Sequence, residues 1–246
     1  MGSYVPTAHS IRRELLRHAN PVKAKLLAGF FKTGKGQYGE GDSFLGIMVP
    51  TQRRIAHRFK RIQLKEIGRL LKEPIHECRF TALEILVDRF EEALKNDNKI
   101  LCDGIIDFYL SHTKYINNWD LVDASAPYIL GAYLAEFKKS PAILYKLAHS
   151  DNLWERRIAI VSTFYFIARD DFRKSIKITK IILQDEHDLI HKAAGWMLRE
   201  VGKRDKKVLI GFLQKYAMVM PRTMLRYAIE KFDTRQRQKY LNMAKI

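Results

Sequence analysis

Apolar and polar positions recur along this chain with the period of an α-helix. Segments of about 12–18 residues carry apolar side chains three and four positions apart, and short gaps rich in glycine or proline separate them. Runs with the alternation of a β-strand are scarce. The pattern predicts helices over residues 8–18, 21–32, 51–60, 64–72, 77–94, 97–111, 118–137, 141–148, 152–168, 172–184, 188–202, 205–216 and 221–231.

A short motif repeats in the second half of the chain. A basic residue, one spacer and an alanine recur at spacings of 35 and 34 residues, as Arg157-Ile158-Ala159, Lys192-Ala193-Ala194 and Arg226-Tyr227-Ala228. Each motif opens the long second helix of a predicted pair, and repeated helix pairs are typical of HEAT and armadillo proteins. The sequence therefore predicts an all-α solenoid that forms a single domain over residues 1–246.

Two segments depart from the helical pattern. Residues 33–43, TGKGQYGEGDS, contain four glycines and lack the spacing of a phosphate-binding loop. We expect a mobile surface loop there, either a plain linker or, through Lys32 and Lys35, a DNA contact. A short basic tail is expected after about residue 233.

Charge narrows the choice of partner. The chain has 44 Lys and Arg against 27 Asp and Glu, a net charge of +17. Such a surplus favours a polyanionic partner, nucleic acid before anionic membrane, although it can also serve solubility. No run approaches the length of a membrane span, and the N-terminus does not resemble a signal peptide. Two cysteines without metal-site spacing fit a reduced cytosolic protein.

One carboxylate lies on an apolar helix face. The apolar stripe of the predicted helix 118–137 comprises Trp119, Val122, Ala126, Leu130 and Tyr133. Asp123 lies in this stripe, four positions after Trp119. Because an isolated charge is costly in a core, we expect the stripe to face a groove at this point. Pro127 leaves the carbonyl of Asp123 without its helical donor and predicts a kink that tilts both side chains toward that groove.

A charge of opposite sign lies on the predicted helix 152–168. Its apolar face comprises Leu153, Ile160, Val161, Phe164, Ile167 and Ala168. Arg157 lies within that face and Arg156 at its edge. One interpretation is an internal salt bridge between Asp123 and Arg157, although a buried bridge adds little net stability. The other is that both residues line a DNA-binding cleft.

Cations accompany a tryptophan on the predicted helix 188–202. Its apolar face comprises Leu189, Ile190, Ala193, Met197 and Val201. Lys192, Trp196 and Arg199 run beside this face, and Gly195 leaves bare backbone next to the indole. Basic side chains interleaved with an aromatic ring suit a sugar–phosphate backbone, although Trp196 also fits a core position. Further basic runs include Arg54 and Arg58; each alone is typical of a solvated face.

These residue types suit one kind of chemistry. Cleavage of an N-glycosidic bond gives deoxyribose an oxocarbenium-like positive charge, which a carboxylate such as Asp123 can stabilise while it positions a water molecule. We recognise no second carboxyl group to protonate the leaving base. A base already made cationic by alkylation at N3 or N7 would not need one.

Four stretches resemble the HEAT-like-repeat DNA glycosylases of the AlkD type, in the DNA alkylation repair enzyme family. They are FLGIMVPTQRR (44–54), NWDLVDASAPYILG (118–131), SDNLWERRIAIV (150–161) and IHKAAGWMLREVGK (190–203), in the family's order and spacing over roughly residues 10–235. The resemblance implies a right-handed α-solenoid of HEAT-like repeats with a concave basic face. The loop 33–43 is longer than in well-known members, and some relatives bind branched DNA with little glycosylase activity.

The resemblance also implies roles for single residues. It makes Asp123 the catalytic carboxylate, Trp119 and Trp196 the tryptophans that contact the sugar, and Arg157 a DNA contact. To these we add, as DNA-binding candidates, Arg156, Lys192, Arg199, Arg54 and Arg58.

The predicted function is that of a monofunctional glycosylase. The resemblance implies that it hydrolyses the N-glycosidic bond of 3-methyladenine and 7-methylguanine in double-stranded DNA without flipping the base into a protein pocket, and we recognise no obvious base pocket in the sequence. The alternatives are a non-catalytic binder of damaged or branched DNA and a protein-binding solenoid. We expect no cofactor and no metal, since the histidines are scattered. A monomer in the cytosol, with the nucleoid and without a membrane partner, is expected.

Overall fold

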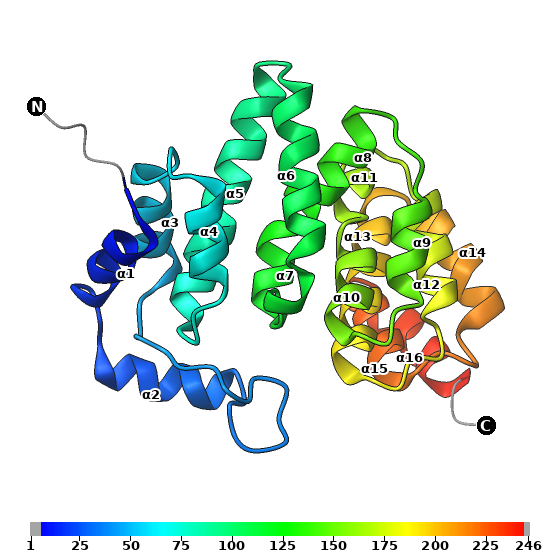
Figure 1. The fold of residues 1–246 in the computed structure, drawn as a ribbon. Coiled ribbons are helices and arrows are strands. Elements are labelled where there is room, and N and C mark those ends of the chain that lie inside the picture. The colour runs from blue at the N-terminus through cyan, green and yellow to red at the C-terminus, as the bar shows by residue number, and fades with distance from the viewer. Residues whose placement is uncertain (1–5, 244–246) are drawn as a thin grey trace, which may run out of the picture. The chain divides into compact units, whose positions relative to one another are not determined.

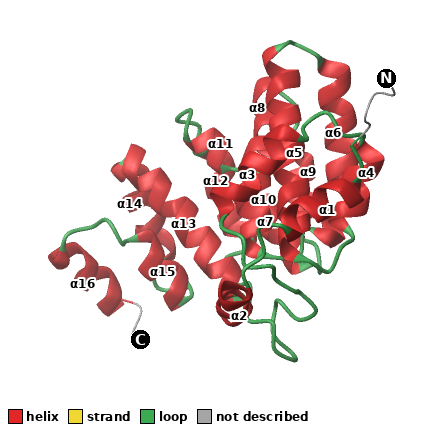
Figure 2. Cartoon of the chain, turned by 90° about the vertical axis from the view of Figure 1, so that its left-hand side faces the viewer, coloured by secondary structure: helices red, strands yellow, loops and turns green. Residues whose placement is uncertain are grey.

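The computed structural model of this chain describes residues 6–243, which form two compact units divided between Ser125 and Ala126. Figure 2 shows helices joined by loops in both units. Within residues 6–243 the only strand-like pairing is an isolated bridge between Ser43 and Ile75. The prediction of an all-helical fold is therefore confirmed, whereas a single domain over the whole chain stays a prediction. No helix in the described range is long and apolar enough to cross a membrane.

The first unit is organised around its longest helix. Its helices are α1 (Ala8–Leu16), α2 (Pro21–Phe30), α3 (Val49–Arg58), α4 (Leu64–Leu71), α5 (His76–Lys95), α6 (Lys99–Ser111) and α7 (Trp119–Ser125), with a 3-10 turn at Thr113–Tyr115. Helix α5 packs against α3, α4, α6 and α7 (Figure 1). Because neighbours cover so much of it, every residue from His76 to Val87 is buried, whatever its polarity.

The segment between α2 and α3 is held by the start of α5. The buried carboxylate of Glu77 accepts backbone N–H groups from Leu45, Gly46 and Ile47 at 2.8–3.2 Å. Gly46 has a φ of +82°, and a Cβ there would lie 2.2 Å from the carbonyl oxygen of Asn20. Only glycine therefore lets this segment pass the first turn of α2.

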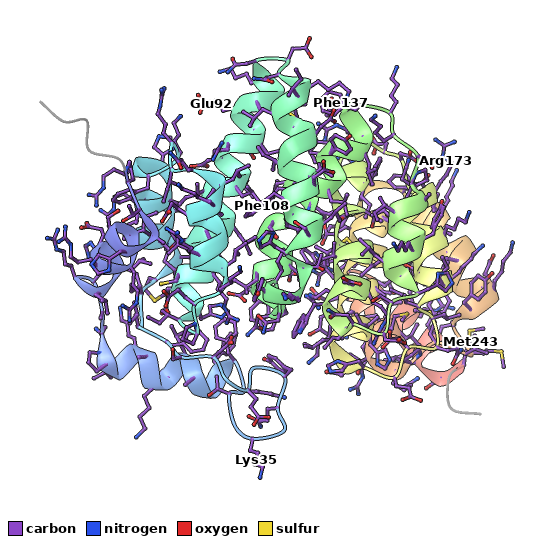
Figure 3. The ribbon with its side chains drawn as sticks, in the orientation of Figure 1. Lys35, Glu92, Phe108, Phe137, Arg173 and Met243 are labelled. Atoms are coloured by element: carbon purple, nitrogen blue, oxygen red, sulfur yellow. The ribbon has the colours of Figure 1, made fainter. Side chains whose placement is uncertain are left out.

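The glycine-rich loop 33–43 forms a series of turns. The N–H of Gly39 donates to the carbonyl of Lys32 at 3.2 Å, and the N–H of Gly36 donates to the Glu40 carboxylate at 2.8 Å. At its end the N–H of Ser43 donates to the carbonyl of Pro74 at 3.0 Å. The loop is thus tied to the first unit at its C-terminal end, while the side chain of Lys35 projects outward from its tip (Figure 3).

The second unit is also built from helices, of which α13 is the longest in the described part. It contains a π-helical turn at Pro127–Gly131 and helices α8 (Ala132–Glu136), α9 (Ala142–Ala148), α10 (Leu153–Val161), α11 (Phe164–Ile167), α12 (Arg173–Ile181), α13 (Asp188–Arg204), α14 (Lys206–Tyr216), α15 (Arg222–Ala228) and α16 (Thr234–Met243). The expected tail after residue 233 is therefore helix α16, which sequence analysis did not predict. Its Tyr240 is buried and lies 5.9 Å from the ring of Phe232.

Helix pairs repeat in the second unit as predicted. Along the chain the pairs are α9 with α10, α12 with α13 and α14 with α15. The second helices pack in series, α10 on α13 and α13 on α15, whereas α14 packs on α13 rather than on α15. The repeated alanines Ala159, Ala194 and Ala228 are at most 1% exposed, so the motif marks positions where only a small side chain fits. The second helix is the longer one in the first two pairs but not in the third. The right-handed superhelix and its concave face stay predictions.

Two predicted helices are interrupted. The predicted helix 118–137 is divided into α7, a π-helical turn and α8, and the N–H of Gly131 donates to the carbonyl of Ala126 at 2.9 Å. This break lies at Pro127, where the missing N–H predicted a kink. The predicted helix 152–168 is divided into α10 and α11 at the buried residues Ser162 and Thr163, whose hydroxyls bond back to carbonyls of α10.

Candidate functional site

The first unit contains a cavity of about 440 Å³ between α2, α3, α5 and α7. Its lining is mainly apolar and rich in aromatic rings, and a few charged groups project into it. The aromatic and acidic lining residues are Phe30, Phe31, Phe44, Phe80, Trp119, Glu77, Asp120 and Asp123. Sequence analysis found no such pocket, because its walls come from segments far apart in the chain.

Helix α7 brings both predicted site residues of the first unit to this cavity. Trp119 is its first residue and Asp123 follows one turn later, so both side chains lie on the same face of α7. Both residues are half-buried, whereas Val122, on the same predicted stripe, is fully buried. The stripe is therefore core at Val122 and cavity wall at Trp119 and Asp123.

Aromatic rings hold the indole of Trp119. Its ring centroid lies 5.2 Å from that of Phe31 with the planes 16° apart, and 5.9 Å from that of Phe30 in an edge-to-face contact. Phe31 stacks in turn on Phe44 at 5.0 Å. Offset and edge-to-face contacts of this kind fix ring orientation as well as burying area. The indole is thus presented to the cavity from a preformed stack.

A buried histidine joins three segments behind this stack. Nδ1 of His76 lies 3.0 Å from Oδ2 of Asp42, at the end of the glycine-rich loop, and Nε2 lies 2.7 Å from Oδ2 of Asp120 on α7. Arg79 pairs with Asp42 and also donates to the side-chain oxygen of Asn117 at 2.6 Å. His76 is 3% exposed, so this network lies inside the first unit.

The two carboxylates keep His76 protonated. Burial by itself would lower the pKa of His76, but the negative charge and hydrogen bond of Asp120, with the hydrogen bond from Asp42, outweigh it and raise the pKa to about 9. Burial pushes the pKa of Asp42 upward, but His76 and Arg79 together hold it below its ordinary value. The carboxylate of Asp120 is therefore paired with the protonated imidazole of His76. Asp123 is the other aspartate on the cavity wall.

The remaining predicted tryptophan lies on α13 in the second unit. Trp196 is half-buried, its Nε1 donates to Oε1 of Glu200 at 3.2 Å, and its ring lies 5.8 Å from that of Phe164. It is therefore not an ordinary core residue. The interpretation of Gly195 was wrong, however: its bare backbone faces α15, where a Cβ would lie 2.5 Å from the carbonyl oxygen of Met224.

Most of the predicted DNA-binding cations of the second unit have partners within that unit. Arg157 is 5% exposed and donates to the carbonyl of Leu189 at 2.7 Å. Arg156 donates through Nε to Asp185 at 2.6 Å, and Lys192 pairs with Asp188 at 2.6 Å. Arg199 pairs with Glu230 and with Glu200. These contacts orient the side chains, and they also offset part of the charge available to a phosphate.

The two predicted cations of the first unit differ in their surroundings. Both lie on α3 and are exposed. Arg58 pairs with Glu14 at 2.6 Å, which holds the pKa of that carboxyl below its ordinary value. Arg54 donates to the uncharged hydroxyl of Thr51 at 3.2 Å. Arg54 therefore keeps more of its positive field than Arg58.

Several residues of the site carried no signal in the sequence. His76, Asp42 and Asp120 lie in three separate segments, and neither spacing nor helical periodicity links them. One hint of Asp120 was present in the sequence, because WDLVD contains two aspartates, Asp120 and Asp123. Only Asp123 was predicted to be a site residue. No cluster of His, Cys, Asp and Glu in the described part of the chain has an arrangement that could hold a metal ion.

The fold places this chain among all-helical proteins built from repeated helix pairs. Similarity to known proteins identifies its family. The chain belongs to the DNA alkylation repair enzyme family, whose sequence pattern matches residues 11–232. Membership supports a role in DNA repair, with DNA as the partner. No curated protein matches the chain.

Solved structures that match this chain include the following two. A predicted DNA alkylation repair enzyme from Enterococcus faecalis is 18% identical, and the match covers 88% of this chain and 98% of that one with a TM-score of 0.69. It therefore has the same fold. The structure of smu.31 from Streptococcus mutans UA159 is 14% identical over 97% of each chain, and its TM-score of 0.49 is too low to bear on the fold.

Proposed function

We propose that this protein is a monofunctional DNA glycosylase that hydrolyses the N-glycosidic bond of cationic alkylated purines, 3-methyladenine and 7-methylguanine, in double-stranded DNA. One observation carries the proposal above the others. The carboxylate of Asp123 lies on the wall of an aromatic cavity beside Trp119, while its neighbour Asp120 is bound to a protonated His76. A carboxylate near DNA repels phosphate and lowers affinity, and a positive charge that develops on the sugar during the reaction would account for its place beside Trp119.

The reaction needs a stabilised sugar cation and a water molecule. The bond between C1′ and the base nitrogen breaks, and its electron pair goes to the base, which leaves as a neutral molecule. The carboxylate of Asp123 stabilises the positive charge that develops on the sugar and orients the water. The oxygen of that water attacks C1′ and its proton passes to solvent. Because the alkylated base is already cationic, no protonating acid is required.

The other predicted residues have supporting roles in this proposal. Trp119 and Trp196 contact the deoxyribose of the damaged nucleotide, and the indole faces favour its cationic form. Arg157, Arg156, Lys192, Arg199, Arg54 and Arg58 act on the phosphates. We also propose that the protein acts as a monomer, in the cytosol with the nucleoid.

Base release from methylated duplex DNA tests the proposal. Wild type should release 7-methylguanine and 3-methyladenine, measured by chromatography of the freed bases. Asp123→Asn should lose roughly 10²–10³-fold in rate, as expected when a group that stabilises developing charge is removed. The matched control is Asp107→Asn, an exposed residue of α6 that does not line the cavity and should keep the wild-type rate.

DNA affinity measured on the same variants separates the outcomes. Asp123→Asn should bind the duplex as well as wild type does, since the carboxylate contributes no attraction to phosphate. If wild type binds DNA and releases neither base, the glycosylase proposal fails and a non-catalytic binder of damaged or branched DNA takes its place. The outward side chain of Lys35 on the glycine-rich loop would then be the first contact to examine (Figure 3).

A further inference from the structure

The second unit contains a groove whose charged lining is almost entirely basic. It encloses about 600 Å³ between α8, α9, α11 and α12, of which α8 packs on α11, α11 on α12 and α12 on α9 (Figure 1). Among the described residues that line it, one carboxylate, Asp171, faces six cations: Lys138, Lys139, Arg169, Arg173, Lys174 and Lys177. This cavity, called the basic groove below, therefore attracts a polyanion.

Aromatic rings position two of these cations. Nζ of Lys177 lies 4.0 Å from the centroid of the Tyr145 ring, and Nζ of Lys174 lies 4.1 Å from that of Phe166. Both rings line the groove themselves. An ammonium group over an aromatic face is held in place without a neutralising anion, so its charge stays available to a ligand. The basic groove is thus more ordered than a set of lysines that only meet water.

Carboxylates offset only part of the positive charge. The hydrogen bond from Arg173, together with that from Lys174, lowers the pKa of Asp171 to about 2, so Asp171 is ionised and paired with these two cations. Arg169 pairs with Glu136 at 2.8 Å. Three lysines of the groove have no ion-pair partner among the described residues: Lys138, Lys139 and Lys177. The charge that remains is therefore positive.

The cations of α12 match a nucleic-acid backbone better than a single phosphate. Arg173, Lys177 and Lys180 recur four and three positions apart, so they lie along one exposed face of α12. At 1.5 Å per residue they span about 10 Å, and one strand of B-DNA carries a phosphate about every 3.4 Å along its axis. Several successive phosphates can lie along this face, whereas a free phosphate would engage only one or two of the cations.

These cations are not the ones that sequence analysis assigned to DNA. In the second unit those were Arg156 and Arg157 on α10, with Lys192 and Arg199 on α13, and none of the four lines the basic groove. Helices α10 and α13 are the second helices of their pairs, whereas the groove lies on the first helices, α9 and α12, with α8 and α11. A duplex bound along α10 and α13 would therefore leave the groove to another partner.

We propose that the basic groove is a second DNA-binding site, which takes the sugar–phosphate backbone of a second duplex and lets one chain bridge two duplexes. DNA is the polyanion that membership of the DNA alkylation repair enzyme family favours. A membrane surface fits less well, since it also takes up apolar side chains. The large apolar residues exposed in the described part of the second unit, Tyr128, Met218 and Val219, do not line the groove.

The number of duplexes bound per chain tests the second site. With a short labelled duplex in excess, sedimentation velocity should show two duplexes on each wild-type chain. The groove variant Lys138→Glu/Lys177→Glu should bind one, with its affinity for the second lowered about tenfold or more. The matched control is Lys65→Glu/Lys215→Glu, which makes the same change of charge at two exposed lysines outside the groove and should still bind two. Thermal unfolding confirms that both variants are folded.

Three outcomes of this count overturn the proposal. They are one duplex on each wild-type chain, no DNA binding by wild type, and two duplexes on the groove variant. Vesicles of phosphatidylglycerol test the other polyanionic surface. If only one duplex binds per chain and wild type binds these vesicles while the groove variant does not, the groove serves a lipid surface and the proposal is wrong.

The base-release assay separates this inference from the proposed function. At saturating duplex the groove variant should release 7-methylguanine at the wild-type rate, because the proposed reaction depends on Asp123, which lies in the first unit. Two duplexes per chain without release of either base would contradict the glycosylase and leave the second site standing. Release that depends on Asp123 with one duplex per chain would do the reverse.

Discussion

Nε2 of His76 lies 2.7 Å from Oδ2 of Asp120, so the first residue of α5 is joined to the second residue of α7 by a charged hydrogen bond. The other ring nitrogen faces Asp42, at the end of the glycine-rich loop. A single protonated side chain thus joins the three segments that carry or support Trp119. The integrity of the candidate site depends on that proton.

Stability should fall as the pH rises through neutrality. The pKa of His76 is raised from 6.5 to about 9 because Asp120 and Asp42 outweigh burial and the like charge of Arg79. The folded state therefore holds the proton more tightly than the unfolded chain does. This contribution, roughly 2–4 kcal/mol, is complete below pH 6.5 and is lost as the pH rises to about 9. Urea unfolding across this window measures the slope, which should be absent in His76→Gln.

Replacement of His76 should also destabilise the protein at neutral pH. His76→Gln leaves Asp120 without its cation and leaves Asp42 with Arg79 and the side-chain amide of Asn118. We therefore expect a loss of about 2–4 kcal/mol in the free energy of unfolding. The matched control is His57→Gln. Its imidazole lies 3.3 Å from Asp88 but its side chain is 72% exposed, and such a pair contributes at most about 1 kcal/mol. Equal losses in the two variants would contradict the role assigned to the His76 network.

Two glycines of the second unit should respond in opposite directions to alanine. A Cβ at Gly195 would lie 2.5 Å from the carbonyl oxygen of Met224 and from Cβ of Tyr227, so Gly195→Ala should push α13 from α15 at a cost of about 1–3 kcal/mol. Gly211 on α14 has nothing within 4 Å of that position, so Gly211→Ala should stabilise by about 0.5–1 kcal/mol. Urea unfolding midpoints of the two variants check the signs.

The two arginines of α3 should contribute unequally to DNA binding. Arg54→Ala should lower the slope of log affinity against log salt concentration by about one, the effect of one lost phosphate contact. Arg58→Ala should change the slope less, because Glu14 at 2.6 Å already offsets the charge of Arg58. Fluorescence anisotropy with a labelled duplex over a series of salt concentrations measures both slopes. A larger change for Arg58 would show that DNA displaces Glu14.

Helical periodicity predicted the fold well where burial follows from local sequence. The α1 to α6 segments and the repeated pairs of the second unit were found because their apolar positions recur every three to four residues. Helix α16 was missed because its residues are almost all polar, and only Tyr240 is buried. The break between α10 and α11 was missed because it depends on hydroxyls that bond to the backbone, and periodicity does not register these.

The candidate site was predicted in part. Trp119 and Asp123 stood out because one helix face held a carboxylate where apolar residues were expected. His76 did not stand out, since it is an ordinary polar residue until distant segments enclose it. Gly195 was misread because a helix seen alone does not show which neighbour its bare backbone will meet.

By itself the sequence determined the all-helical fold, the repeat and the positive charge, because these depend on composition and on spacing along the chain. It also marked one carboxylate as out of place. Only the tertiary structure decided that Asp120 is bound to a protonated histidine and that five phenylalanine and tryptophan rings line one cavity. Both depend on burial among segments that are far apart in the chain, and burial alters pKa values in ways that no local pattern records.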